Sequence, residues 1–159
     1  MTENIFKTYI NNANISKIYD FLRKMDKDLN PRLSDMLDLV AYSKKISKNA
    51  VIITSENDNE IVGMVAFYLN KEPEYSFWTF FGVLEDYRKS LLAIQLEKKI
   101  ISFCKNNEST GIECVVSLYN SKLINVHKLL GFKIHKIYYD DLHSLERAVL
   151  RLDFPRQSD

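Results

Sequence analysis

The sequence predicts one α/β (α+β) domain over residues 1–159, with a mixed, mostly antiparallel, twisted sheet flanked by helices. Three observations predict this fold class. The chain has 159 residues, which suits one domain with a single substantial core. Helical and strand periodicities follow one another in the order β-α-α-β-β-β-α-β-α-β-β. Three consecutive strands precede a strand–helix–strand pattern, which is typical of a mixed sheet with helices on its faces.

The N-terminal part is predicted to form a strand and two helices. The strand is "IFKTYI", residues 5–10. A helix follows Asn14, a residue type that caps helices, because apolar residues then recur at helical spacing. Pro31 separates this helix from a second one, which we expect to run from "PRLSDML" to about Lys48.

The middle of the chain is predicted to form three strands and a helix. "AVIITSE" and "IVGMVAFYLN" are joined by "NDNE", a hairpin signal. "EYSFWTFFGVLE" is so apolar that we expect it to be buried on both faces. A helix is expected after Arg88, with Leu92, Leu96, Ile100 and Phe103 on one stripe.

The C-terminal part is predicted to form a strand, a helix and two further strands. "IECVVSLY" is the first strand, and "SKLINVHKLL" is a helix that ends at Gly131, a common residue just after a helix. "FKIHKIYY" and "RAVLRLDF" are strands around the turn "DDLH".

The composition indicates a packed protein of the cytoplasm. Apolar residues make up 46% of the chain, which includes nine Phe and nine Tyr. The net charge of +1 gives no bias toward nucleic acid, and no apolar stretch is long enough to span a membrane. The N-terminal segment lacks the pattern of a signal peptide. Cys104 and Cys114 form no disulfide framework and are expected to be packing residues.

A basic segment opens the helix that follows the third middle strand. Arg88, Lys89 and Ser90 lie where the helix is expected to begin. A helix N-terminus has unpaired N–H groups and partial positive charge, so it can hold an anion such as a phosphate. The alternative is a solvated basic turn before an ordinary surface helix.

The element order and two local signatures resemble the GNAT superfamily of acyl-CoA N-acyltransferases over almost the whole chain. The first signature, Gln/Arg-x-x-Gly-x-Gly/Ala after a strand and opening a helix, reads "RKSLLA" here, Arg88 to Ala93. The second is an Asn followed by a helix that ends in aromatic-x-x-x-Gly-Phe. It reads Asn120 and then "HKLLGF", His127 to Phe132.

The resemblance implies acetyl-CoA as cosubstrate. Backbone N–H groups of the loop and helix start would hold its pyrophosphate, and the preceding strand would pair with its pantetheine arm. Gly82 would permit a bulge or a close backbone approach, or it is a packing glycine. The residues expected at the coenzyme A site are Phe81, Gly82, Val83, Arg88, Lys89, Ser90, Leu91, Leu92, Ala93 and Asn120.

Two residues depart from the family pattern. Leu91 stands where the family usually has glycine, so it would weaken or reshape the phosphate site unless Lys89 compensates with charge. His127 stands where the family usually has the tyrosine that protonates the departing thiolate, so it is the candidate catalytic residue. The alternative is a packed core histidine, because it shares a helical face with Leu123 and Leu130.

The sequence offers no clear general base. Glu74, Tyr75 and Glu85 flank the third middle strand. Carboxylates at the ends of a strand are usually solvated surface groups. The resemblance implies that water can carry the proton away from the amine. Direct attack of the amine on the thioester requires no metal.

The segment "LNPRLSDMLDLVAYSKKISKNAVII" is also similar to a bacterial GNAT subgroup associated with surface-polysaccharide and amino-sugar pathways. This region covers the acceptor site in the family, so Arg32, Asp35 and Tyr42 are candidate acceptor contacts, with capping or surface roles as the alternative. The expected reaction is acetyl transfer from acetyl-CoA to a primary amine of a small molecule. A protein or peptide N-acetyltransferase and a non-catalytic acyl-CoA-binding protein are the alternatives. A monomer and a homodimer are both consistent with the sequence.

Overall fold

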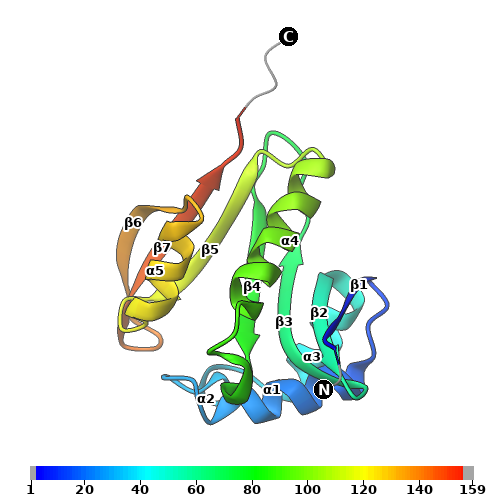
Figure 1. The fold of residues 1–159 in the computed structure, drawn as a ribbon. Coiled ribbons are helices and arrows are strands. Elements are labelled where there is room, and N and C mark those ends of the chain that lie inside the picture. Colours follow the sequence, from blue (N-terminus) through cyan, green and yellow to red (C-terminus); the bar gives the residue numbers. More distant parts are fainter. Residues whose placement is uncertain (1–2, 156–159) are drawn as a thin grey trace. The chain divides into compact units, whose positions relative to one another are not determined.

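The computed structural model describes residues 3–155, which form two compact units (Figure 1). The first unit comprises the described residues up to Tyr68 together with Phe80–Ile100, and the second comprises Leu69–Thr79 and the described residues from Ile101 onward. β4 (Ser76–Val83) and α4 (Leu92–Asn106) each contribute residues to both units. The predicted domain of residues 1–159 includes positions 1–2 and 156–159, which lie outside the described residues.

The first unit begins as the sequence predicts, with β1 (Ile5–Ile10) and α1 (Ile15–Asp26). The Oδ1 atom of Asn14 accepts a hydrogen bond from the Lys17 N–H at 3.1 Å, which confirms the predicted N-cap. The apolar stripe of α1 lies in the core of this unit, as its helical spacing requires.

The prediction of one continuous second helix was wrong. The segment forms α2 (Leu33–Met36) and α3 (Leu39–Asn49), separated by Leu37, whose backbone is extended at φ −157° and ψ 165°. Asp38 then caps α3, because its Oδ1 atom accepts a hydrogen bond from the Ala41 N–H at 3.0 Å. An aspartate that caps a new helix therefore interrupts the helix, although the apolar periodicity continues across it.

The sheet of the first unit has the strand order β1-β2-β3-β4, in which β2 (Val51–Asn57) and β3 (Glu60–Tyr68) form the predicted hairpin. Asp58 and Asn59 both have positive φ, 49° and 67°, which is the geometry of a tight hairpin turn. β4 alternates between buried and partly exposed residues up to Phe81, so the expectation of burial on both faces was wrong for most of the strand.

Helices cover both faces of the first unit's sheet. α1 and α3 pack on the face that carries Met64. Gly63 precedes Met64 on β3, so a side chain at this position would lie on the opposite face of the sheet. A Cβ atom at Gly63 would lie 2.9 Å from Leu96 Cδ1, so the missing side chain makes room for the first part of α4.

The sheet of the second unit has the strand order β4-β5-β7-β6 (Figure 1). The start of β4 pairs in parallel with β5 (Gly111–Ser117), and the remaining pairs are antiparallel. β6 (Lys133–Asp140) and β7 (Leu145–Asp153) are the two predicted C-terminal strands. Across both units the pairing is mixed and mostly antiparallel, as predicted.

The remaining helix of the second unit also agrees with the sequence. α5 (Ser121–Leu129) is followed by Gly131, whose φ of +103° explains why glycine stands there. Both cysteines are buried, and burial raises the pKa of Cys104 to about 11, so its thiol stays protonated at neutral pH. Among the described residues, no helix is long and apolar enough to cross a membrane.

Candidate functional site

The segment between β4 and α4 is a tight turn. A 3₁₀ turn, η1 (Glu85–Tyr87), leads into residues 88–91, and α4 begins at Leu92 rather than directly after Arg88 as expected. The Ser90 hydroxyl donates a hydrogen bond to the Tyr87 carbonyl at 2.5 Å and accepts one from the Leu92 N–H at 3.3 Å. Ser90 therefore fixes the turn and satisfies one N–H group at the helix start.

The start of α4 has the physical properties of an anion site. The first-turn N–H groups of Ala93 and Ile94 have no acceptor within the helix, and the helix dipole places partial positive charge there. Lys89 and Ser90 are exposed beside this turn. Leu91 is 68% exposed, so most of its side chain lies in solvent.

Arg88 lies at the same turn but makes contacts within the first unit. Its Nε–H donates to the Val83 carbonyl at 2.8 Å, and its Nη2–H donates to the Asp28 carboxylate at 3.0 Å. Nη2 also lies 3.9 Å from Met25 Sδ. Arg88 therefore links the end of α1 to the end of β4, and its charge faces a carboxylate.

The end of β4 is closely packed. A Cβ atom at Gly82 would lie 2.8 Å from Met25 Cε and 3.1 Å from the Phe80 ring, so packing alone explains the glycine. Val83 is buried, and Phe81 is partly exposed. The structure thus supports the packing alternative for Gly82.

The candidate residues of the second unit lie on α5. The Asn120 Oδ1 atom accepts a hydrogen bond from the Leu123 N–H at 3.2 Å and so caps the helix. His127 is 1% exposed. Its ring centroid lies 4.8 Å from that of Trp78 and 5.2 Å from that of Phe132, which makes His127 part of an aromatic core.

The candidate acceptor residues lie in the first unit. Arg32 is exposed immediately before α2, and Asp35 is exposed on that turn. Tyr42 is partly buried on α3 and packs against the core of the unit. The connection between α1 and α2 is closed by Asp26, which accepts hydrogen bonds from the Ser34 N–H at 2.8 Å and the Ser34 hydroxyl at 2.6 Å.

The sequence analysis missed a buried carboxylate, Glu56. It is 3% exposed and accepts hydrogen bonds from Lys17 Nζ at 2.7 Å, the Thr54 hydroxyl at 2.7 Å and the Tyr9 hydroxyl at 2.8 Å. Burial opposes ionisation, but these hydrogen bonds together lower the pKa of Glu56. Burial and the bond to Glu56 raise the pKa of Tyr9 to about 12.

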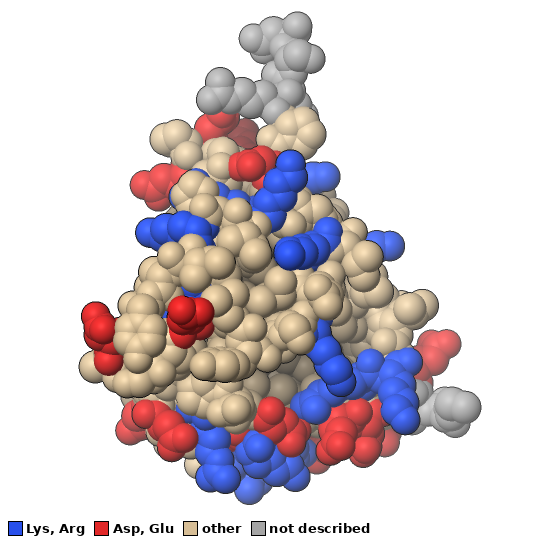
Figure 2. All heavy atoms as spheres, turned by 90° about the vertical axis from the view of Figure 1, so that its left-hand side faces the viewer, with Lys and Arg blue, Asp and Glu red and all other residues tan. Residues whose placement is uncertain are grey.

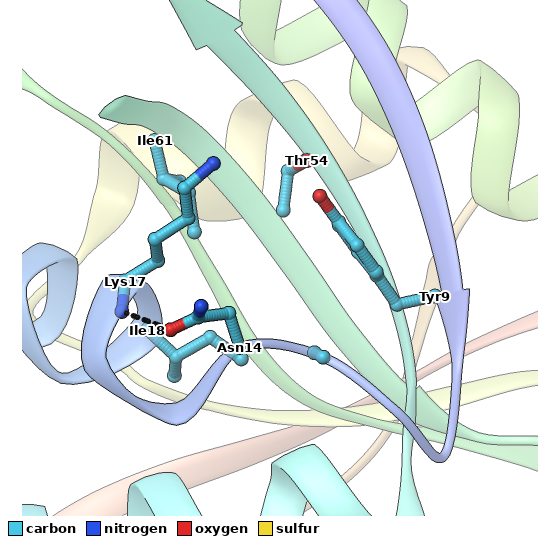
Figure 3. Close-up of a pocket in the computed structure, with 7 residues that line it drawn as sticks. Tyr9, Asn14, Lys17, Ile18, Thr54 and Ile61 are labelled. Atoms are coloured by element: carbon cyan, nitrogen blue, oxygen red, sulfur yellow. Dashed lines mark hydrogen bonds between the residues drawn. The ribbon is translucent and has the colours of Figure 1, made fainter. Parts of the chain in front are cut away.

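Figure 3 shows the small cavity beside this carboxylate, lined among others by Tyr9, Asn14, Lys17, Thr54 and Ile61. The sequence signal was a glutamate within a strand, separated from the apolar run Val51–Ile53 only by Thr54 and Ser55. A second carboxylate, Glu97 on α4, is also fully buried and was not singled out either.

These observations define an α/β protein with a helix start suited to phosphate after its fourth strand. The model of the acetyltransferase (GNAT) family matches residues 16–132, a range that contains both signatures. The chain therefore belongs to the GNAT family of acetyltransferases, and acetyl-CoA is its cosubstrate.

Solved structures agree with this fold. A GNAT acetyltransferase from Streptococcus pneumoniae shares 11% identity and a TM-score of 0.75, covering 96% of this chain and 100% of that one. The ribosomal-protein-S18-alanine N-acetyltransferase of Escherichia coli shares 10% identity and a TM-score of 0.76, covering 98% and 97%. NAA60 of Arabidopsis thaliana, in complex with a bisubstrate analogue, shares 15% identity and a TM-score of 0.71, covering 94% and 98%. No curated protein sequence matches significantly.

Proposed function

We propose that this acetyltransferase acts on a primary amine of a small molecule, such as an amino sugar, by direct attack of the amine on the thioester. The observation that carries the cofactor half of this proposal is the start of α4. Its first-turn N–H groups point out of the helix end, and Lys89 and Ser90 are exposed beside them. This arrangement suits the pyrophosphate of coenzyme A.

Each candidate residue then has a distinct task. The N–H groups of Ala93 and Ile94 face the phosphates, because the Leu92 N–H already donates to the Ser90 hydroxyl, and Lys89 adds a positive charge. The exposed side chain of Leu91 leaves the loop backbone open despite the missing glycine. Bound acetyl-CoA supplies the activated carbonyl and a thiolate leaving group.

The end of β4 would hold the pantetheine arm through backbone groups of Phe81 to Val83. The Val83 carbonyl already accepts a hydrogen bond from Arg88, so we assign pairing with the arm to other backbone groups of this stretch. A backbone N–H of this strand also polarises the thioester carbonyl, which stabilises the charge that develops on its oxygen.

The acceptor contacts are proposed on the segment between α1 and β2. Arg32 supplies an exposed cation, and Tyr42 supplies a hydroxyl. One cation and one hydroxyl suit an acceptor that carries hydroxyl or acidic groups besides its amine. Asn120 caps α5 and remains a proposed contact of the second unit.

The proton that the amine loses passes to water, and the thiolate takes up a proton as the carbon–sulfur bond breaks. The family signature alone makes His127 the candidate donor. Its burial in an aromatic cluster favours a packing role, so its contribution is tested separately below.

The proposal is tested in two steps. Calorimetry with acetyl-CoA measures binding, and absence of binding at millimolar concentration would refute the cofactor site. Thiol release is then measured with amino sugars, other small amines and peptides that carry a free N-terminus or lysine. Faster turnover of peptides would identify a protein acetyltransferase. Binding without thiol release from the whole panel would identify a non-catalytic acyl-CoA-binding protein, which the departures at Leu91 and His127 favour.

A further inference from the structure

β6 is the edge strand of the second unit's sheet. It pairs with β7 on one side, and the strand order ends there. Lys133–Tyr139 are all exposed, and these residues include three large apolar or aromatic side chains in a row, Ile137, Tyr138 and Tyr139. An exposed apolar edge strand offers unpaired backbone groups to another strand.

The chain protects only one end of this edge. The pairing between β6 and β7 shifts register between Ile134 and Lys136, and such a bulge disrupts further pairing. Lys136–Asp140 pair regularly with β7, from Val149 to Leu145. Five consecutive residues therefore remain as a regular template.

This template is complementary to itself. If two copies of Lys136–Asp140 align antiparallel about a two-fold axis through Tyr138, each Lys136 lies opposite the partner's Asp140. Each Ile137 then lies opposite the partner's Tyr139, and the two Tyr138 side chains face one another. Opposite charges and apolar pairs directly across an antiparallel pair are stabilising. A shift of one residue places either Lys136 opposite Asp141 or His135 opposite Asp140, and in both cases Ile137 no longer lies opposite Tyr139.

The acidic member of the pair is held in place by its own subunit. Asp140 accepts hydrogen bonds from Arg147 Nε at 2.7 Å and from the backbone N–H of His143 at 3.2 Å, and its Oδ2 lies 2.9 Å from His143 Nδ1. A carboxylate has lone pairs for further donors, so Lys136 of a second copy can join this group. Figure 2 views the side on which β6 lies, and uncharged side chains cover most of its middle.

We propose that the protein forms a homodimer in which two β6 strands pair antiparallel about Tyr138. This isologous interface buries Ile137 and Tyr139 of both subunits and forms two identical pairs of Lys136 with the partner's Asp140. The interface is independent of the proposed acceptor and of catalysis.

Sedimentation equilibrium over a wide concentration range tests the dimer. We expect a mass twice the chain mass of 18.6 kDa for the unchanged protein. Ile137→Lys should raise the dimer dissociation constant at least about tenfold, because the change occurs twice in a symmetric interface. The matched control is Ile10→Lys on β1, because Ile10 is 57% exposed and Ile137 is 54% exposed. A monomer at all concentrations, or an equal effect of both substitutions, would refute the proposal.

Two further variants test the register. Lys136→Glu places like charges opposite one another and should weaken the dimer about tenfold or more, whereas Lys45→Glu, at an exposed residue of α3, should not. Tyr138→Cys brings the two new thiols together on the axis, so mild oxidation should link the subunits, because paired residues of antiparallel strands lie within disulfide reach. Tyr119→Cys, which is also exposed, should not link them, and the buried native cysteines stay silent. A dimer that Tyr138→Cys fails to link has a different interface.

Discussion

Arg88 is the residue whose expected role changes most once its contacts are known. The basic segment suggested a direct phosphate contact, but the guanidinium holds the Val83 carbonyl and the Asp28 carboxylate. These contacts hold the guanidinium against the end of β4. There it orients the backbone that we propose to pair with the pantetheine arm. We therefore expect Arg88 to act as a positioning residue.

This role predicts that Arg88 and Lys89, two cations of one loop, affect ligand binding differently. Arg88→Ala should weaken binding of coenzyme A and of pantetheine by a similar factor, roughly fivefold for about 1 kcal/mol, and should lower the melting temperature. Lys89→Ala should weaken only coenzyme A, since pantetheine lacks the pyrophosphate. Calorimetry with both ligands measures the factors. If Arg88→Ala weakened the binding of coenzyme A but not of pantetheine, Arg88 would contact the phosphate directly.

Leu91 provides a second prediction at this scale. It precedes the first residue of α4 and is 68% exposed, so Leu91→Gly removes little packing. Glycine is better tolerated than leucine at the position before a helix, so the melting temperature should stay unchanged. Coenzyme A affinity should be unchanged or higher, because glycine permits closer backbone approach. Isothermal titration measures the affinity, and a clear loss of it would show that the leucine side chain itself contributes to the site.

His127 allows a test that separates packing from proton transfer. His127→Phe preserves the aromatic contacts with Trp78 and Phe132 but removes the proton donor. We expect turnover within about threefold of the unchanged enzyme, whereas loss of a general acid costs about 100-fold or more. His127→Ala should destabilise the fold by about 3 kcal/mol through the cavity it leaves. Rates measured between pH 6 and 9 would decide, and a large loss in His127→Phe with normal stability would establish catalysis.

At the scale of elements, Glu56 joins β1, α1 and β2 through Tyr9, Lys17 and its own strand. The pKa of Glu56 is lowered in the folded protein, so its stabilising effect is fully present above the ordinary value of 4.5 and is lost as the pH falls below it. Glu56→Gln should therefore reduce the acid sensitivity of folding. It should also lower stability at neutral pH by about 2–3 kcal/mol, because Lys17 loses its charged partner.

Glu60→Gln is the matched control for this prediction. Glu60 forms an exposed pair with Lys24 at 3.3 Å, so the same change of charge should alter stability by less than about 1 kcal/mol. Urea denaturation at pH 4 and pH 7 measures both variants. If the stability of Glu56→Gln depended on pH as strongly as that of the unchanged protein, other carboxylates would be responsible for the loss of stability in acid.

The elements also show what sequence periodicity can and cannot predict. Strongly patterned elements with clear caps, such as α1 after Asn14 and α5 before Gly131, form as expected because local signals and burial agree. The split at Leu37 was missed because the apolar period continues across it, while the Asp38 cap acts through a side-chain hydrogen bond. The start of α4 was displaced for a similar reason, since Ser90 ties residues 88–91 into a turn.

At the scale of the whole molecule, the order of elements and two signatures were sufficient to predict the family, because neither depends on side-chain contacts. The candidate site was less predictable. The carboxylate partner of Arg88, Asp28, lies 60 residues away in the sequence, and no local pattern links the two residues. The burial of Glu56 and His127 likewise depends on residues distant in sequence.

The path of the chain through the two units has a consequence for synthesis on the ribosome. The first unit contains residues up to Tyr68 and then Phe80–Ile100, with a stretch of the second unit between them. Its sheet cannot receive the end of β4 until Val83 has been translated, and the face that carries Gly63 cannot receive the first part of α4 until Ile100 has been translated. Until then Gly63 and its neighbours on β3 face water. The nascent chain therefore exposes an apolar sheet face for a defined interval, which is when a chaperone that binds such surfaces has access to it.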